Sequence, residues 1–575
     1  MRLSEALRIN QQAVSDAAPV RALHLVCGFT PLHLETFLQA HVRRRFSGDR
    51  VRIMSGLFGD LEGNLQRAAE TAAEGAVVAI EWADLDSRLG WRASAGWSTK
   101  AGADIAQQAA ESLDRIEKSI STLASKMRVA IIAPTLPIAP LMHTPPAQAG
   151  ALELELRCAM ASFLHRIGNY LHARIVSEQA LASLSPYAQR HDMKMELHAG
   201  FPFTIPHAAA VAQLAMECLF PIEPKKGLIT DLDDTLWKGI LGDVGVEGVS
   251  WCLDGHSQAH AIYQQLLGSL AESGVLVAIA SKNDPELTAR VFERTDVLLK
   301  ATQFFPAEVN WGPKSESIAR ILHVWNVLPE SVVFVDDSAM ELAEVSEKFP
   351  DMECVRFPSE DPAGVVELVH QLRGRFGKEL VREEDQLRLK SLRTAAAAVE
   401  SSHGEISTDF LARLEAKLTL DFSTGANDQR AMELVNKTNQ FNLNGRRFTE
   451  VEWRSYFEHP GAFLLTATYE DRFGPLGKIA ALAGLVEAGK VRVEVCVMSC
   501  RAFARHIEFR VLESLYRKFG AEQITFGFQP TTRNKPLREF FSRFFAAGVP
   551  EGEFELSAAE FAGACPPLFQ EVSEK

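Results

Sequence analysis

Two carboxylates in the middle of the chain are the residues best placed to do chemistry. Asp231 and Asp233 directly follow an apolar segment, residues 227–230, that predicts a buried strand. At the carboxyl end of a parallel strand, where open α/β sheets build their sites, Asp231 could attack phosphorus to give an aspartyl-phosphate. Asp233 could protonate the leaving oxygen and then activate water. Close carboxylates facing a phosphate also need a cation, and Mg²⁺ prefers oxygen ligands. The sequence therefore predicts Mg²⁺-dependent phosphoryl transfer.

Further polar residues follow in the order that such a site requires. They are Ser281, Lys314, Asp336 and Asp337. Ser281 and Asp336 each follow an apolar run that predicts a strand, so Ser281 could hydrogen-bond a phosphoryl oxygen and Asp336 could complete the metal shell, with Asp337 behind it. Lys314 stands at a predicted helix start, where it could neutralise the phosphate. Each residue alone is more often a helix cap or turn residue, but the ordered set predicts one site at one sheet edge.

Two α/β domains and one α+β domain are expected to position these residues. Residues 1–220 alternate short β-like runs with longer helical stretches, which is typical of a parallel α/β layer domain. Residues 221–375 repeat this alternation around the site. Residues 376–403 are charged and Ala-rich, which predicts an exposed connecting helix. Residues 404–575 predict a mixed α+β domain. The strands expected there cover residues 463–469, 478–486, 491–498 and 523–528, and the helices cover residues 503–519 and 536–545.

Composition limits the possible functions. The 575 residues are 47% hydrophobic and 23% charged, which is ordinary for a globular protein of several domains of roughly 150 residues each. A formal charge of −14 disfavours binding to nucleic acid or anionic membranes. No apolar run is long enough to cross a bilayer, and the first residues lack a hydrophobic signal core. We therefore expect a cytoplasmic protein that binds neither nucleic acid nor membrane.

The ordered site residues resemble the four motifs of the haloacid dehalogenase superfamily. These motifs are DLDDT (residues 231–235), Ser281, Lys314 and the pair Asp336–Asp337. In that superfamily an acid at the position of Asp233 goes with phosphatase or phosphoryl-transfer chemistry rather than dehalogenation. Only 49 residues separate Asp231 from Ser281, and 32 separate Ser281 from Lys314, which leaves no room for a large cap domain. The resemblance implies a capless Rossmannoid domain whose site is open or covered by a neighbouring domain.

Longer segments resemble the FkbH-like family within that superfamily. Around the site they are DLDDTLWKGILGDVGVEGV, SKND, VNWGPK and FVDDSAMELAEV. EWADLDSRLGWR (81–92) and HAGFPFTIPHA (198–208) fit the family's N-terminal region, which is similar to an SGNH-hydrolase or flavodoxin-like fold. LVNKTNQFNLNGRRFT (434–449), DRFG (471–474), SCRAFARHIE (499–508) and PTTRNKP (530–536) fit its C-terminal region, which is similar to an acetyltransferase-like (GNAT) fold. The resemblance covers nearly the whole chain.

The family resemblance implies a bifunctional phosphatase and acyl transferase. Such an enzyme takes a glyceryl unit from 1,3-bisphosphoglycerate, removes phosphate and loads the unit onto the phosphopantetheine thiol of an acyl carrier protein, for polyketide-type biosynthesis. Asp231 and Asp233 would be catalytic. Mg²⁺ would be held by Asp231, the backbone carbonyl of Asp233, Asp336 and Asp337. The phosphate-binding residues that the resemblance implies are Thr235, Ser281, Lys282, Asn283 and Lys314.

The chain departs from the family pattern at positions that concern acyl transfer. Ala280 stands where family members commonly carry a Cys before the motif Ser, so no thioester can form there. Cys500 is then the candidate acyl carrier, provided that a neighbouring arginine lowers its pKa. The alternative is a buried packing cysteine. Ala504 and His506 replace glycines in the loop where acetyltransferases contact the pantetheine pyrophosphate, which puts coenzyme A binding in question.

Two other functions remain open. The chain could be a capless phosphatase without acyl transfer, or a non-enzymatic scaffold that recruits a carrier protein; the intact superfamily motifs argue against the scaffold. Residues 27–30 read CGFT where an SGNH hydrolase would show Gly-Asp-Ser, so we expect the N-terminal domain to be a non-catalytic docking or covering domain. His198 and His207 are interpreted as packed or capping histidines.

Overall fold

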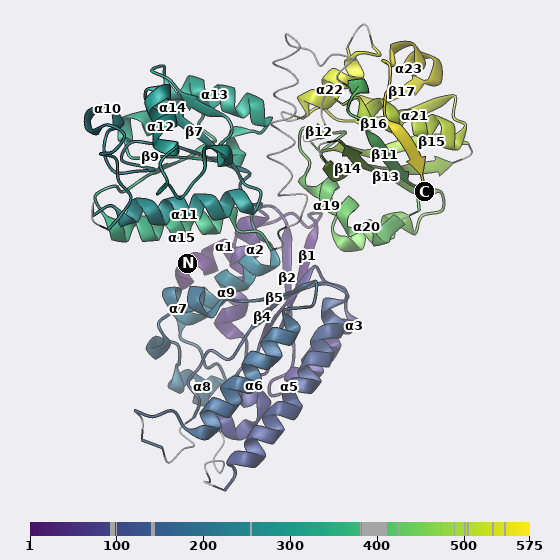
Figure 1. Ribbon diagram of the computed structural model, residues 1–575. Coiled ribbons are helices and arrows are strands. Elements are labelled where there is room, and N and C mark those ends of the chain that lie inside the picture. Colours follow the sequence, from purple (N-terminus) through teal and green to yellow (C-terminus); the bar gives the residue numbers. More distant parts are fainter. Residues whose placement is uncertain are drawn as a thin grey trace. The chain divides into compact units, whose positions relative to one another are not determined.

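The computed structural model describes most of the chain. Residues 93–97, 99, 140–143, 146, 254–255, 380, 382–410, 424, 473, 488, 500–501, 503–504, 532–533 and 546–547 lie outside the description. The chain divides into two compact units, Met1–Glu223 and Pro224–Lys575. Three sheets succeed one another along it, one in the first unit and two in the second (Figure 1).

The first sheet is fully parallel. Its strands are β1 (Val20–Cys27), β2 (Arg50–Ser55), β3 (Gly75–Ala79), β4 (Arg128–Ile132) and β5 (Ala173–Ile175). They lie in the order β2-β1-β3-β4-β5, which is the doubly wound order of flavodoxin-like folds. Because successive side chains of a strand point to opposite faces, Val77 and Ala79 of β3 enter one core while Ala76 and Val78 enter another.

Helices cover both faces of this sheet, as parallel sheets require. On one face lie α1 (Leu3–Asn10), α2 (Leu32–Arg45) and α9 (Ile205–Leu219). On the other lie α3 (Leu61–Glu70), α5 (Gly102–Ala124) and α6 (Ala151–Ile167). The shorter helices of this unit are α4 (Trp82–Leu85), α7 (Glu178–Leu184) and α8 (Met193–Ala199).

The second sheet carries the predicted site and is also fully parallel. Its strands are β6 (Gly227–Thr230), β7 (Leu276–Ser281), β8 (Ala307–Val309), β9 (Val332–Asp336) and β10 (Glu353–Arg356), in the order β10-β9-β6-β7-β8. One face packs against α11 (Gln258–Glu272) and α15 (Pro362–Phe376), and the other against α13 (Lys314–Trp325) and α14 (Ala339–Lys348) (Figure 1). The first motif therefore ends the central strand of the sheet.

The insertions near the site are short. Between β6 and β7 the described residues form α10 (Leu241–Val244), a two-residue bridge between Lys238 and Ser250, and α11. Between β7 and α13 they form α12 (Pro285–Phe292), a 3₁₀ turn (Ala301–Gln303) and β8. Neither stretch holds a separate cap domain among its described residues, in agreement with the spacing of the motifs.

The third sheet is mostly antiparallel. Its strands are β11 (Lys417–Asp421), β12 (Phe441–Asn442), β13 (Ala462–Asp471), β14 (Gly474–Glu487), β15 (Lys490–Met498), β16 (Gln523–Phe528), β17 (Gly552–Ser557) and β18 (Glu571–Glu574). The helices are α19 (Gln429–Lys437), α20 (Glu450–Phe457), α21 (Ile507–Phe519), α22 (Lys535–Ser542) and α23 (Ala558–Ala564). The predicted α+β character of this part is confirmed. α21 begins later than predicted, after His506 in a left-handed conformation (φ 58°).

One strand of this third sheet fills a gap between two others. β15 and β16 pair in parallel only over residues 491–493 and 524–526. Beyond that point β12 pairs with the end of β15, where Phe441 lies opposite Met498. The N–H of Leu443 then donates to the carbonyl of Cys496 at 3.0 Å, and the N–H of Gln529 donates to the carbonyl of Leu443 at 3.1 Å. The segment thus bridges the two diverging strands.

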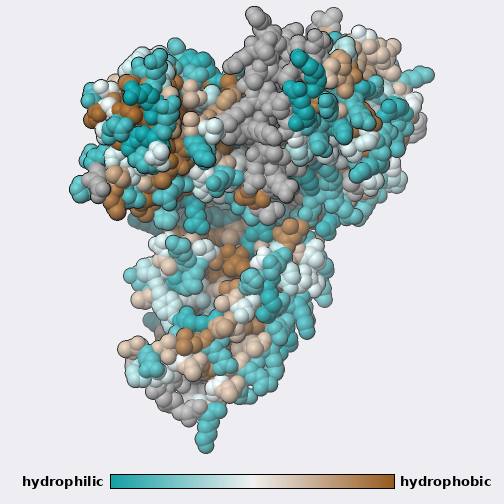
Figure 2. Space-filling model, viewed as in Figure 1, coloured by the Kyte–Doolittle hydropathy of each residue, from teal (hydrophilic) through white to brown (hydrophobic). Residues whose placement is uncertain are grey.

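Two sequence expectations concern membrane-spanning helices and the connecting helix between domains. Within the described residues, no helix combines the length and the apolar character needed to cross a membrane. The face in Figure 2 shows hydrophobic residues in small groups among hydrophilic ones. The connecting helix expected at residues 376–403 falls almost wholly outside the described residues, after α15 ends at Phe376. The domain limits drawn from the sequence stay predictions.

Candidate active site

Three adjacent strands bring the motif residues to one edge of the second sheet. Asp231 follows β6 directly, and its N–H donates to the carbonyl of Val335 in β9 at 3.0 Å. Ser281 and Asp336 are the last residues of β7 and β9, which flank β6 on either side. Since all five strands are parallel, these side chains meet at the carboxyl edge, as the sequence predicted.

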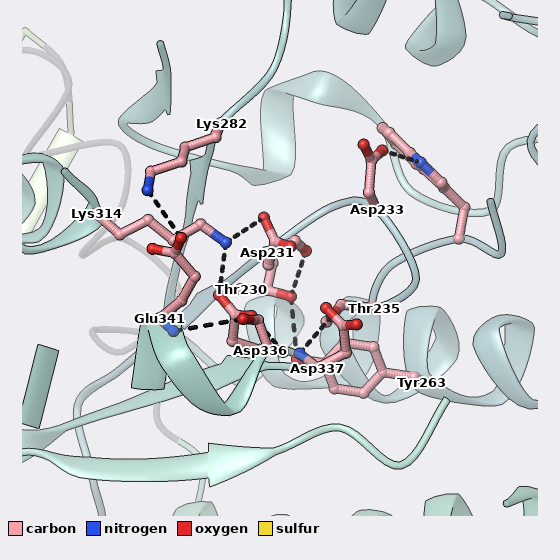
Figure 3. A network of polar contacts seen from close by, with 12 residues as sticks. Thr230, Asp231, Asp233, Thr235, Tyr263, Lys282, Lys314, Asp336, Asp337 and Glu341 are labelled. Carbon is pink, nitrogen blue, oxygen red and sulfur yellow. Dashed lines mark hydrogen bonds and ion pairs between the residues drawn. The ribbon is translucent and has the colours of Figure 1, made fainter. Parts of the chain in front are cut away.

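Lys314 joins two of the carboxylates. Its Nζ lies 3.0 Å from Oδ1 of Asp231 and 2.6 Å from Oδ2 of Asp336 (Figure 3). The lysine is only 4% exposed and is the first residue of α13, as predicted. Burial acts to lower the pKa of Lys314, but the two carboxylates outweigh it and hold that pKa above its ordinary value. A charged ammonium is therefore fixed at the centre of the site.

Three carboxylates are close enough to share a cation. One oxygen each of Asp231, Asp336 and Asp337 lies within 4.8 Å of the others. Burial, followed by the charge of Asp231, raises the pKa of Asp336 to about 6, although Lys314 opposes this shift. Burial also raises the pKa of Asp337, again helped by Asp231. The crowded acids and their all-oxygen character fit a hard divalent cation, which would relieve their repulsion.

Asp233 stands apart from these carboxylates (Figure 3). Its Oδ1 accepts a hydrogen bond of 2.9 Å from the indole Nε1 of Trp237, and the side chain is partly exposed. Burial raises the pKa of Asp233, while the bond from Trp237 opposes the rise. Its carboxylate is not among the three that could share a cation. A raised pKa and partial exposure suit a group that exchanges protons with substrate and water.

A buried polar network supports the loops of the site. The hydroxyl of Tyr263 donates to Oγ1 of Thr230 at 3.2 Å, and Oγ1 of Thr230 donates to the carbonyl of Asp231 at 2.9 Å. The N–H of Asp337 donates to Oγ1 of Thr235 at 3.1 Å, and Thr235 is fully buried. The structure thus places Thr235 as a support for the Asp337 loop. Its phosphate-binding role stays a prediction.

The residues after β7 have different surroundings. Lys282 pairs through Nζ with Oε1 of Glu341 at 2.8 Å, and Glu341 lies in the first turn of α14. Asn283 is 2% exposed, and its Nδ2 has no hydrogen-bond partner among the described residues. Ser281 is 4% exposed at the end of β7. The side chain of Asn283 acts to lower the pKa of Asp233, and the charge of Lys282 is paired with Glu341.

Sequence reasoning missed the residues that position the motif side chains. Trp237, four residues after Asp233, carried a usable signal because it lies within the same motif segment. Tyr263 lies on α11, and Glu344 of α14 accepts from the N–H of Ser315 at 3.2 Å. These partners are distant in the sequence, so no local pattern could have identified them.

The N-terminal unit contains a series of buried, hydrogen-bonded polar side chains at the carboxyl edge of its own sheet. Oγ1 of Thr135 donates to Oε1 of Glu81 at 2.6 Å and lies 2.9 Å from Nε2 of His207. Nδ1 of His207 lies 3.0 Å from the hydroxyl of Ser185, and His207 is fully buried. Burial lowers the pKa of His207 to about 3. The expectation of a packed His207 is confirmed. His198 is exposed in the last turn of α8, so it is not packed, and a capping role for it stays a prediction.

Cys500, the candidate acyl carrier, lies outside the described residues, as do Arg501 and Ala504. Its role stays a prediction.

Comparisons with known proteins add a fold relationship. The chain resembles the crystal structure of the N-terminal part of the protein BF1531 from Bacteroides fragilis, described as containing a phosphatase domain complexed with Mg. The TM-score is 0.51 at 19% identity, over 66% of this chain and 100% of that one. No family model and no curated protein matches the chain.

Two other structures give TM-scores too low to support an argument. One is an uncharacterized protein from Corynebacterium glutamicum, with a TM-score of 0.20 at 18% identity over 27% of this chain and 98% of that one. The other concerns a GCN5-related glucosamine N-acetyltransferase region of a fungal β-N-acetylglucosaminidase, with a TM-score of 0.14 at 10% identity over 94% and 65%. The likeness to the BF1531 fragment therefore shows a shared fold.

Proposed function

We propose that this chain is a Mg²⁺-dependent phosphatase of the haloacid dehalogenase type, with Asp231 as the nucleophile. The observation that carries the proposal is the arrangement around Lys314, whose Nζ contacts Asp231 and Asp336 while Asp337 completes a cluster of three carboxylates. The BF1531 fragment, which shares the fold, was crystallised with Mg. In this chain Asp231, Asp336 and Asp337 would hold Mg²⁺, which when bound would offset the repulsion between the carboxylates and a phosphate.

The residues of the chain account for the steps of such a reaction. A carboxylate oxygen of Asp231 attacks phosphorus, the bond from phosphorus to the leaving oxygen breaks, and Asp231 carries the phosphoryl group. Asp233 gives its proton to the leaving oxygen, which its raised pKa favours. Asp233 then takes a proton from water, which attacks the aspartyl-phosphate and releases phosphate. Lys314 holds positive charge beside Asp231 throughout.

Phosphate release with and without Mg²⁺ tests this proposal. We expect Asp231→Asn to abolish release while leaving the fold intact, because the amide is nearly isosteric but cannot attack phosphorus. Losing a covalent nucleophile normally costs several orders of magnitude in rate. The matched control is Asp243→Asn, an exposed acid of α10 in the same domain. More than about a tenth of the rate remaining in Asp231→Asn, or full activity in excess chelator, would contradict the proposal.

The finer proposal concerns the substrate and comes from the FkbH-like resemblance. We propose that the phosphorylated substrate is of the glyceryl type, such as 1,3-bisphosphoglycerate, and that the glyceryl unit passes to the phosphopantetheine thiol of an acyl carrier protein. The described residues of the insertions near the site form no separate cap domain, which supports access by a large partner. The alternative is phosphatase activity alone, as Ala280 and the replaced glycines would permit.

Weighing the carrier after incubation distinguishes these two possibilities. The protein is incubated with 1,3-bisphosphoglycerate, Mg²⁺ and a pantetheinylated carrier, and the carrier is analysed by intact mass. We expect a glyceryl adduct on the carrier, and we expect Cys500→Ala to slow loading while phosphate release from a simple phosphoester continues. Loading at the wild-type rate in Cys500→Ala would favour direct attack by the pantetheine thiol on the acyl phosphate. An unmodified carrier would contradict acyl transfer and leave phosphatase activity as the only proposed function.

A further inference from the structure

A small pocket opens in the C-terminal part of the chain, apart from the carboxylates of the second sheet. Its volume is about 130 Å³, and its lining residues are Phe441, Met498, Glu508, Pro536, Glu539, Phe540 and Arg543. They come from β12, the end of β15, α21, and α22 with the residue that follows it (Figure 1). Pockets for drug-sized ligands measure about 300–1,000 Å³, so this one suits a molecule of only a few heavy atoms.

The base of the pocket is apolar and buried. Phe441, Met498 and Phe540 are at most 6% exposed, and Phe441 lies opposite Met498 in the β12–β15 pairing. The polar residues Glu539 and Arg543 are exposed and stand at the rim. A ligand would therefore place a short hydrocarbon part on the base and a charged part toward the rim.

One polar atom in this apolar surround is not satisfied by the protein. Oε2 of Glu508 is buried and has no hydrogen-bond partner within the part of the chain that the structure describes. A buried acceptor without a partner destabilises the folded protein, and native structures rarely keep one without a reason. Burial also raises the pKa of Glu508 to about 7, with Arg543 opposing the shift. The carboxyl group is suited to accept a hydrogen bond from an uncharged donor, such as a hydroxyl.

We propose that this pocket binds a short-chain hydroxy acid. The ligand hydroxyl donates to Oε2 of Glu508, its carboxylate pairs with the guanidinium of Arg543, and its hydrocarbon part lies on Phe441 and Met498. The proposal goes beyond the phosphatase function and does not depend on it, because none of these residues belongs to the carboxylate cluster around Lys314.

Two ligands that differ only by the hydroxyl test the assignment. Binding of 3-hydroxybutyrate and of butyrate to the full chain is measured by ligand-observed NMR, with a chelator present so that the carboxylate cluster holds no metal. A site built to hydrogen-bond a hydroxyl rejects an analogue that lacks it. We expect 3-hydroxybutyrate to bind at least tenfold more tightly than butyrate.

Variants then locate the binding. Glu508→Leu should abolish the preference for the hydroxyl, and since it removes an unpartnered buried oxygen it should not lower the melting temperature. Glu508→Gln, which keeps an acceptor oxygen, should retain the preference. Arg543→Ala should weaken both ligands at least tenfold, whereas Arg538→Ala, at an exposed arginine of α22 that does not line the pocket, should change neither.

Four results would overturn the proposal. One is equal affinity of the wild-type protein for both ligands, and another is the absence of saturable binding, which would leave the pocket to water. The third is a hydroxyl preference that survives Glu508→Leu. If 4-aminobutyrate bound more tightly than 3-hydroxybutyrate, the ligand class would be an amino acid and the hydroxy-acid assignment would be wrong.

Discussion

Removing the ammonium of Lys314 should destabilise the second sheet at its centre. In Lys314→Met the side chain keeps much of its volume but loses the charge that lies 3.0 Å from Asp231 and 2.6 Å from Asp336. The lysine side chain is 5% exposed, and those of its two partners are 8% and fully buried, so water cannot replace it. Breaking a buried pair in this way costs about 3–5 kcal/mol.

The sign of the pH dependence follows from the acids left behind. The pKa of Asp336 already lies above its ordinary value, at about 6, and loss of Lys314 removes a group that opposes this rise. When folding raises the pKa of a carboxyl, the folded protein loses stability as pH rises through that pKa. The reason is that the folded state binds the proton more tightly than the unfolded state does. The cost of Lys314→Met should therefore be larger at pH 8 than at pH 5.

Native-state hydrogen exchange is the appropriate assay because the chain has several domains. Exchange is followed by mass spectrometry in peptides that cover β6 and β9, without divalent ions. The matched control is Lys282→Met, whose pair with Glu341 is partly exposed and should cost about 1 kcal/mol or less. Mg²⁺ should restore part of the protection in Lys314→Met. Equal losses in the two variants would refute the view that Lys314 is the central buried cation.

Three further changes have outcomes that the structure determines. Gly28→Ala would place a methyl group 1.8 Å from Oδ1 of Asp84, which should destabilise the N-terminal unit by about 1–3 kcal/mol in thermal unfolding. Trp237→Phe removes the N–H that favours ionised Asp233, so the limb of the kcat/KM pH profile that reports this acid should move to higher pH. His207 has a pKa lowered to about 3, so the N-terminal unit should lose stability as pH falls from about 6.5 toward 3, and His207→Gln should reduce that loss.

A specific result would contradict each of these three predictions. Gly102→Ala, whose new methyl group would meet its nearest atom at 3.9 Å, is the control for Gly28→Ala, and equal effects would show that the close approach is absent. An unchanged pH profile in Trp237→Phe would remove Asp233 as the titrating group. An acid transition of unchanged size in His207→Gln would assign the loss to other groups.

The edge of the sheet could be predicted from the sequence because each motif residue ends an apolar run. Asp231, Ser281 and Asp336 lie at the carboxyl ends of adjacent strands that pair in parallel. These residues are therefore close in the structure although they are distant in the sequence. Lys314 was recognised by its place at a helix start. These inferences needed only the period of the hydrophobic pattern and the direction of the strands.

The arrangement within that edge could not be predicted in the same way. The position of the Asp233 side chain was not predicted: Asp234 adopts a left-handed conformation (φ 47°) after it, and the Asp233 carboxylate accepts a hydrogen bond from Trp237. The pairing of Lys282 with Glu341 of α14 was not predicted either, and its phosphate-binding role stays a prediction. Such partners depend on loop conformation and tertiary packing, which leave no trace in local spacing.

The measurement that tests the central claim most directly is the detection of a phosphoryl group on Asp231. The wild-type protein is mixed with a phosphate monoester and Mg²⁺, quenched in acid during turnover, digested and analysed by mass spectrometry. The account predicts one added phosphoryl group on the peptide that contains Asp231, removable by hydroxylamine and absent from Asp231→Asn. Steady turnover with that peptide unmodified, or a phosphoryl group on another residue, would contradict it.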